Sequence, residues 1–200
     1  MKKNNYFFNF ISSYRNFFFK VLFFEIYYSI RFGVLIPKIK IHNNPKRTDT
    51  VPCIYFFLHE ISKFLMKKNI KSVVDIGSGY GRVVNFINSI NNIKTYGVEY
   101  DKEAFNYSLT IRKKNMKLYC GDIFNFDLKK FNSKCFILVD PFKKVEDRTK
   151  LLNKIKRIYP KQKKYIIAVN NYKGSFPKFL TLIQSTIASK TRTLKIFEIS

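Results

Sequence analysis

Residues 71–82 read KSVVDIGSGYGR, an apolar run followed by three glycines spaced two residues apart. Val73 and Val74 are β-branched and apolar, which favours a buried strand over 72–76. After the glycines, apolar residues recur at helical spacing, and this predicts a helix over 81–90. The stretch is therefore interpreted as a strand, a tight glycine turn and the start of a helix.

Each glycine of this turn has a physical task. One lets the chain reverse with a positive φ, one lets the backbone approach a ligand, and one lets the helix pack close to the strand. The first N–H groups of the helix then point into the crevice at the carboxyl end of the strand. The alternative is an ordinary glycine-rich connection without a ligand, because short glycine motifs occur in many unrelated chains.

Strand-like and helical segments alternate along the rest of the chain. This alternation predicts an α/β fold with a doubly wound, mostly parallel sheet and right-handed crossovers. Residues 189–192 lie between two final strand-like runs and suit a hairpin turn. The predicted strands are 72–76, 95–99, 117–120, 135–139, 164–169, 180–187 and 193–199, and the predicted helices are 53–68, 81–90, 101–114 and 145–159.

Acidic side chains stand at the ends of successive predicted strands, where an open parallel sheet binds its ligands. Glu99 ends the second strand, and its two oxygens can accept hydrogen bonds from both hydroxyls of a ribose. After the third strand, Asp122 can accept from the exocyclic amine of an adenine while Ile123 packs on the ring. Asp140 follows the fourth strand, and Asp75 precedes the turn, where it can hold the loop or meet an ammonium group. The chain has only 13 acidic residues, so this arrangement indicates a pocket for one adenosine and a positive charge.

Together these motifs resemble the class I S-adenosylmethionine-dependent methyltransferases over about residues 50 to 170. The family's first motif, an acid followed by G-x-G-x-G, is matched by residues 75–81. An acid at the end of the second strand is matched by Glu99, and an acid after the third strand by Asp122. The fourth motif falls on Asp140-Pro141-Phe142. Residues 31–34 and the helix after residue 52 resemble small bacterial members with an N-terminal helical extension.

The resemblance implies a Rossmann-like sheet of seven strands whose last strands form an antiparallel hairpin, with S-adenosyl-L-methionine as the cofactor. It points to Asp140 as the catalytic residue facing the methyl group; the alternative is a strand-end residue that only shapes its loop. A single proline follows Asp140, whereas enzymes that methylate exocyclic base amines often carry two, which disfavours that acceptor. The cofactor-binding residues that the resemblance implies are Asp75, Gly77, Ser78, Gly79, Gly81, Glu99, Tyr100, Asp122 and Ile123.

The composition limits the class of protein and its compartment. Two hundred residues suit one domain with a short appendage. Three widely spaced cysteines and two histidines form neither a zinc pattern nor a disulfide framework, so we expect no metal and a reducing, cytoplasmic compartment. The net charge of +25 alone favours a polyanionic partner, but the lysines are spread along the chain, as A/T-rich coding would produce. The densest run, 143–164, is interpreted as a solvated helix face rather than a nucleic-acid patch.

The first 50 residues differ from the rest in their high content of Phe and Tyr. Residues 1–50 are predicted to form a helical extension and linker, and residues 51–200 the cofactor-binding domain. Polar and charged residues interrupt the apolar run well short of the roughly 20 residues that a spanning helix needs. Apolar residues between Phe7 and Val21 lie near one face of an amphipathic helix, which we expect to cover the core. The alternative is an interfacial helix, so peripheral membrane contact through residues 5–30 stays open.

We therefore predict an S-adenosylmethionine-dependent methyltransferase and keep two rivals. A dinucleotide-binding oxidoreductase would prefer G-x-G-x-x-G, and counting from Gly77 this chain has Arg82 at the third glycine. The other rival is a non-catalytic protein that keeps the fold. His59 lies on a predicted helix and is interpreted as structural. The methyl acceptor is left open among small molecules, saccharides, lipids, proteins and RNA.

Overall fold

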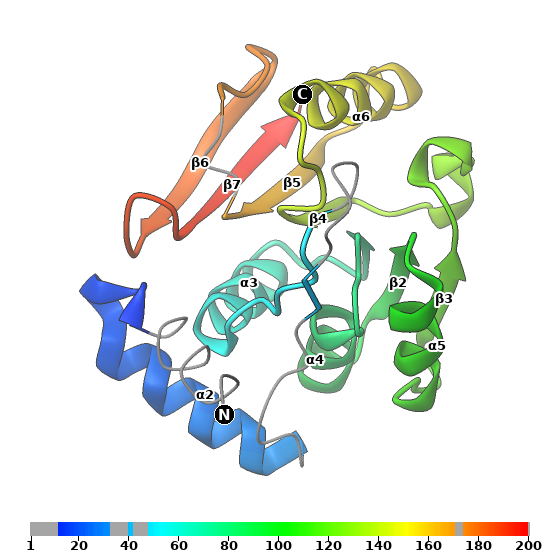
Figure 1. Ribbon diagram of the computed structural model, residues 1–200. Coiled ribbons are helices and arrows are strands. Elements are labelled where there is room, and N and C mark those ends of the chain that lie inside the picture. Colours follow the sequence, from blue (N-terminus) through cyan, green and yellow to red (C-terminus); the bar gives the residue numbers. More distant parts are fainter. Residues whose placement is uncertain (1–11, 33–39, 42–47, 171–173, 200) are drawn as a thin grey trace.

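The computed structural model describes residues 12–32, 40–41, 48–170 and 174–199, which form one mixed sheet with helices on both faces (Figure 1). The sheet has seven strands in the order β3-β2-β1-β4-β5-β7-β6. Strands β1 to β5 are parallel, and β7 runs antiparallel between β5 and β6. This confirms the predicted fold and its C-terminal hairpin. The strands are β1 (Ser72–Ile76), β2 (Lys94–Glu99), β3 (Met116–Cys120), β4 (Cys135–Val139), β5 (Lys164–Val169), β6 (Leu180–Ile187) and β7 (Thr193–Ile199).

The strand order reverses beside β1, and this places the ligand crevice. The chain runs outward from β1 through β2 to β3, and then returns to place β4 on the other side of β1. In the parallel register Ile76 lies beside Val98 on one side and Leu138 on the other. The loops after β1, β2 and β4 therefore meet at one edge of the sheet, where such folds bind their ligands.

Two hydrophobic cores, one on each face of the sheet, follow from the alternation of side chains along the strands. Val73 faces the core shared with the N-terminal helices, and Val74 faces the core shared with α6. The first face is covered by α2 (Phe18–Phe32), α3 (Tyr55–Lys67) and α4 (Arg82–Asn91), preceded by the short turn η1 (Arg15–Phe17). The second is covered by α6 (Val145–Ile158) and the turns η2 (Ile123–Asn125) and η3 (Leu128–Phe131).

Helix α5 ends earlier than predicted. It spans Lys102–Thr110, whereas the sequence pattern predicts a helix to residue 114. Asp101 caps it as expected, because its carboxylate accepts the N–H of Ala104 at 2.9 Å. At the other end the Arg112 N–H bonds the Leu109 carbonyl in a tight turn. Strand β3 begins only a few residues later, so the chain must reverse there and cannot add another helical turn.

The described part of the amphipathic helix predicted between Phe7 and Val21 is interrupted: Tyr14 precedes the turn η1, and α2 begins only at Phe18. The packing against the core is as predicted. Tyr14 and Val21 are fully buried in the same cluster as Val73. The Tyr28 hydroxyl and His59 Nδ1 form a hydrogen bond at 3.2 Å, so His59 joins α3 to α2. The predicted apolar positions before residue 12 lie outside the described residues. Among the described segments, no helix is both long enough and apolar enough to cross a membrane.

A buried ion pair joins α2 to the start of α4. Glu25 pairs with the Arg82 guanidinium through one oxygen and accepts the N–H of Tyr55 at 2.6 Å through the other. Arg82 also donates to the carbonyl of Cys53 and lies over the Tyr55 ring, 3.7 Å from its centroid. Arg82 is the first residue after the glycine turn. The N-terminal helix therefore holds the residue on which that turn ends.

Substituting Glu25→Gln should destabilise the protein by about 3 kcal/mol, because it leaves the Arg82 charge buried without a counter-ion. Urea unfolding at neutral pH measures this loss. The matched control is Glu60→Gln on α3, which breaks the exposed pair with Lys63 and should cost about 0.5 kcal/mol or less. Equal, small losses in both variants would show that the ion pair does not hold α2.

Candidate functional site

A cavity of about 600 Å³ opens at the carboxyl edge of the sheet beside the glycine turn. Its walls come from the loops after β1 to β4 and from the segment that precedes α3. The volume suits a cofactor-sized ligand, and the position agrees with the reversal of strand order next to β1. Seven of the predicted site residues line this cavity: Gly77, Ser78, Gly79, Glu99, Tyr100, Asp122 and Ile123.

Glu99 joins the first two loops of the site. One carboxylate oxygen accepts the N–H of Gly79 at 2.6 Å, and the other accepts the N–H of Asp101 at 2.7 Å. Burial raises the pKa of Glu99, and the N–H groups of Asp101 and Gly79 oppose that rise. Each oxygen keeps further lone-pair capacity, because a carboxylate has about four acceptor sites. Glu99 can therefore hold the glycine turn and still accept hydroxyl groups from a ligand.

The glycines at 79 and 81 serve different contacts. Gly79 has φ +52°, and a Cβ there would lie 2.8 Å from the Thr50 methyl group. Gly81 has φ +83°, and a Cβ there would lie 3.0 Å from the Ser108 side chain on α5. Gly81 does not line the cavity. Its task is close packing of two helices, whereas the sequence pattern predicts close packing of a helix on a strand.

The segment before α3 crosses over the glycine turn, and we call residues 40–41 and 48–53 the strap. Lys40 and Thr50 exchange two backbone hydrogen bonds, of 3.1 and 2.8 Å. Thr48 donates its hydroxyl to the carbonyl of Pro141 at 3.3 Å, beyond β4. Strap residues from Thr48 to Cys53 line the cavity. The linker predicted from its prolines is thus one wall of the site.

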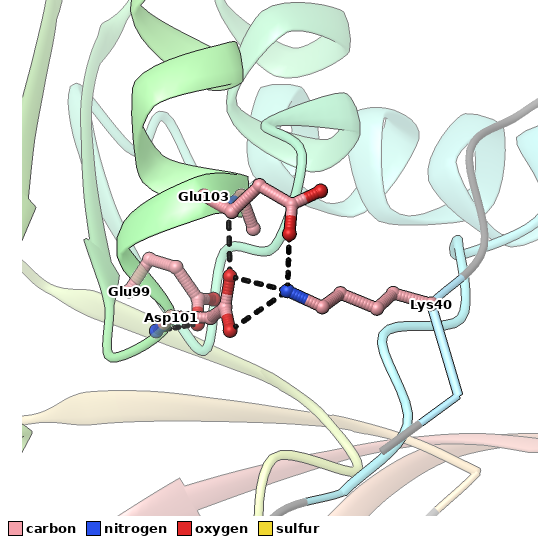
Figure 2. Close-up of polar contacts among 5 residues, drawn as sticks. Lys40, Glu99, Asp101 and Glu103 are labelled. Atoms are coloured by element: carbon pink, nitrogen blue, oxygen red, sulfur yellow. Dashed lines mark hydrogen bonds and ion pairs between the residues drawn. The ribbon is translucent and has the colours of Figure 1, made fainter.

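Figure 2 shows how Lys40 fastens the strap to the loop after β2. Its ammonium group lies 3.2 Å from the Asp101 carboxylate and 2.6 Å from that of Glu103. Asp101 is buried and also caps α5, so Lys40 forms its ion pair with a side chain that the helix already holds in place. The strap is therefore held at the β2 side by charge and at the β4 side by Thr48.

Asp75 lies directly before the turn and is fully buried. Neither of its carboxylate oxygens has a hydrogen-bond partner among the described residues. Burial raises the pKa of Asp75 well above its ordinary value, and the nearby charge of Glu99 raises it further. An ionised carboxylate is costly in such surroundings, so Asp75 favours the protonated form or a nearby cation.

Asp140 is placed at the end of β4 with φ +44°, in the left-handed region. Val139, Pro141 and Phe142 line the cavity, but Asp140 is not among the lining residues in the described part of the chain. Burial lowers the pKa of Arg148 on α6, and the Asp140 charge opposes this. The backbone at Asp140 therefore borders the cavity while its charge acts on α6.

The far side of the cavity contains residues that sequence reasoning missed. The rings of Phe124 and Phe142 lie 5.9 Å apart, and the Lys150 ammonium lies 4.8 Å from the Phe124 centroid. Asp147, in the first turn of α6, also lines the cavity. Of these residues only Phe142 had a signal in the sequence, because it is the last residue of the fourth motif.

Other predicted features can be placed as well. Asn170, directly after β5, is buried. Within residues 12–32, 40–41, 48–170 and 174–199, no group of three or more His, Cys, Asp or Glu side chains can hold a metal ion. All three cysteines are unpaired.

Comparison with known proteins gives consistent results. A family model described as a methyltransferase domain matches residues 67–197. No curated protein matches the sequence. An RNA methyltransferase from Salinibacter ruber, solved in complex with S-adenosyl-L-homocysteine, is 16% identical with a TM-score of 0.54, over 74% of this chain and 94% of that chain. A SAM-dependent methyltransferase from Aquifex aeolicus is 16% identical with a TM-score of 0.52, over 70% and 89%. At these identities the two structures show a shared fold alone.

The burial of Asp75 predicts a pH-dependent stability. The pKa of Asp75 in the folded chain lies above its ordinary value of 3.8. At a pH between these two values, Asp75 is protonated in the folded chain and ionised in the unfolded chain. The free energy of unfolding should therefore fall as the pH rises through that window. Asp75→Asn cannot titrate, so its slope, measured by urea unfolding at several pH values, should be smaller. An unchanged slope would contradict this account of Asp75.

Proposed function

The chain belongs to the family of methyltransferase domains and is an S-adenosyl-L-methionine-dependent methyltransferase, and we propose that its cofactor binds in the cavity beside the glycine turn. The observation that carries this proposal is Glu99, which stands at the end of β2 with its carboxylate fastened to the N–H of Gly79. Seven of the proposed cofactor-binding residues line the cavity: Gly77, Ser78, Gly79, Glu99, Tyr100, Asp122 and Ile123. Asp75 and Gly81, which stand at the two ends of the turn, complete the proposed site and support it without lining the cavity.

The residues at the ends of β2 and β3 fit the adenosine part of that cofactor. Glu99 retains acceptor capacity for ribose hydroxyls after it binds two backbone N–H groups. Asp122 accepts the N–H of Phe124 through one oxygen and lines the cavity beside buried Ile123. An acid and an apolar surface side by side suit the amine edge and the face of an adenine.

The residues before and at the turn fit a cation better than a pyrophosphate. Asp75 offers a buried carboxylate with no hydrogen-bond partner among the described residues, which a nearby cationic ligand would favour in its ionised form. The cation next to the turn, Arg82, is already neutralised by Glu25. The N–H of Gly79 donates to Glu99 and is not directed at a ligand phosphate. Because Arg82 and the N–H of Gly79 are already paired within the chain, the site favours a cationic methyl donor over the dinucleotide of an oxidoreductase.

Bound S-adenosyl-L-methionine supplies a methyl group on a positively charged sulfur. The chain must hold the acceptor in line with that methyl group and keep water away. The strap serves the second task, because it packs on Gly79 and is fastened at Lys40 and Thr48. Phe124 and Phe142 provide an apolar surface on the side away from Glu99.

The acceptor is not specified, and we propose Asp140 as the residue that acts on it. The residues on both sides of Asp140, Val139 and Pro141, line the cavity, which supports a role for Asp140 at its border. Asp147 is the rival, since it lines the cavity as found. The Salinibacter neighbour methylates RNA, but its likeness to this chain is one of fold.

For organisation and location, we propose that residues 51–200 form the cofactor-binding domain and residues 1–50 its extension. The cytoplasmic location rests on the three unpaired cysteines, two of them buried. Peripheral membrane contact through residues 5–30 is part of the same proposal. Residues 5–11 lie outside the described segments, so α2 carries the argument for it.

Substituting Glu99→Gln should weaken S-adenosyl-L-homocysteine binding about tenfold or more, because the amide NH₂ would face a backbone N–H where an oxygen accepted it. Gly79→Val should abolish binding, since its Cβ would clash with Thr50 and strain a φ of +52°. Calorimetric titration measures both. The control is Glu198→Gln on β7, which loses only the pair with Lys163 and should bind normally. Wild-type affinity in both site variants would refute the proposed site.

Substituting Asp140→Asn should leave S-adenosyl-L-homocysteine affinity unchanged and reduce turnover about 100-fold, as expected for a lost general base. Asn tolerates the left-handed backbone at this position, so the fold should persist. The assay is transfer of labelled methyl groups to acceptor pools from a cell extract. A comparable loss in Asp147→Asn, with Asp140→Asn fully active, would move the role to Asp147.

A further inference from the structure

Helix α2 carries a continuous apolar stripe on the face that points away from the core. Five large side chains form it. Their spacings along the sequence are four, three, one and three residues, and at 3.6 residues per turn this places all five on one side of the helix. They have no cover among the described residues. The exposed fractions are 82% for Phe19, 62% for Phe23, 54% for Ile26, 47% for Tyr27 and 69% for Ile30. We call these five residues the α2 stripe.

The α2 stripe is not needed to build the fold. The opposite face of the same helix already covers the sheet through buried Val21 and Tyr28. The single acid of α2, Glu25, points inward and is paired with Arg82. A helix that is apolar on both faces normally has both faces covered. The outer face is therefore available to a second partner.

In the described segment from Arg15 to Phe32, every exposed charged side chain is positive. Arg15 precedes the helix, Lys20 lies in its first turn and Arg31 in its last, and all three are exposed. By helical spacing Lys20 and Arg31 flank the stripe on one side, and Arg15 lies toward the other. The chain as a whole carries +25. This charge favours a partner that is both negatively charged and able to receive aromatic side chains.

We propose that α2 lies flat on an anionic lipid surface, with the α2 stripe inserted among the headgroups and Arg15, Lys20 and Arg31 at the phosphates. Short helices with a cationic rim and a Phe-rich or Leu-rich face bind membranes in this manner. Aromatic residues favour that interface because one part of the ring is apolar and its edge or hydroxyl is polar. This inference deepens the peripheral contact proposed above and identifies the surface that makes it.

Docking through α2 would also fix the orientation of the cavity relative to the lipid surface. Phe32, the last residue of α2, lines the cavity, and Glu25 on the same helix holds Arg82 at the end of the glycine turn. The helix is therefore a rigid support of the site. Resting on the proposed function, this arrangement keeps the methyl-transfer site next to acceptors that are carried on the membrane.

Sedimentation of the full chain with vesicles tests the docking. At low salt, wild-type protein should pellet with vesicles that contain phosphatidylglycerol and much less with pure phosphatidylcholine. The double variant Phe23→Ser with Ile30→Ser should weaken binding about tenfold or more, because two apolar side chains no longer insert. Substituting Lys20→Gln or Arg31→Gln should weaken binding to the anionic vesicles about fivefold each. The effect of each substitution should be smaller at high salt, because salt screens the charges.

The matched control is Leu182→Ser with Ile187→Ser on β6, which removes two apolar side chains of similar exposure, 50% and 56%, from another surface. It should bind vesicles as wild type does. Both double variants should keep the wild-type midpoint of unfolding, because neither removes a buried contact, and both should bind S-adenosyl-L-homocysteine normally.

Three outcomes would overturn the proposal. Wild-type protein that stays in the supernatant at low salt excludes lipid docking. Equal losses in the α2 and β6 variants would mean that no specific surface binds. A wild-type dimer that the α2 variant converts to a monomer, without vesicle binding, would assign the stripe to a second copy of the chain. Ligand binding that persists in any of these cases would leave the proposed function intact.

Discussion

The hydrogen bonds of Glu99 are the constraint on which the site depends. Its carboxylate accepts an N–H from Gly79 in the turn after β1 and another from Asp101 at the start of α5. These two hydrogen bonds fix the loop after β1 against the loop after β2. Asp101 extends the network outward, because it caps α5 and receives Lys40 from the strap. The floor and cover of the cavity are thus linked through two acidic side chains, Glu99 and Asp101.

A second buried acid supports the same turn from behind. Glu25 neutralises Arg82, so the cation next to the glycines belongs to the scaffold and is not offered to a ligand. This commitment explains why the N-terminal helix packs on the domain rather than standing apart from it. Asp75, before the turn, is also buried, and its carboxylate has no hydrogen-bond partner among the described residues. The α2 helix then has one face engaged with the site and the other exposed.

The fold could be predicted because its signals are local. Apolar runs marked central strands such as β1, β4 and β5, and glycine spacing marked the turn. Asp101 stands where a helix was predicted to begin, and it caps α5. Contacts between segments far apart in the chain could not be predicted. The strap meets Gly79 and Pro141 only after the chain has folded. The left-handed backbone of Asp140, and its absence from the residues that line the cavity, had no signal in the sequence either. For α2, the sequence allowed two interpretations: a helix that covers the core and a helix that lies on a membrane. In the structure one face of α2 packs in the core, and a second apolar face is exposed.

Calorimetric titration of the wild-type chain with three ligands tests the central claim most directly. If the Glu99 site is built for a methyl donor, S-adenosyl-L-methionine and S-adenosyl-L-homocysteine should each bind with one site per chain, and NAD should not bind. Binding of NAD without either methionine-derived ligand, or no binding by any of the three, would contradict it.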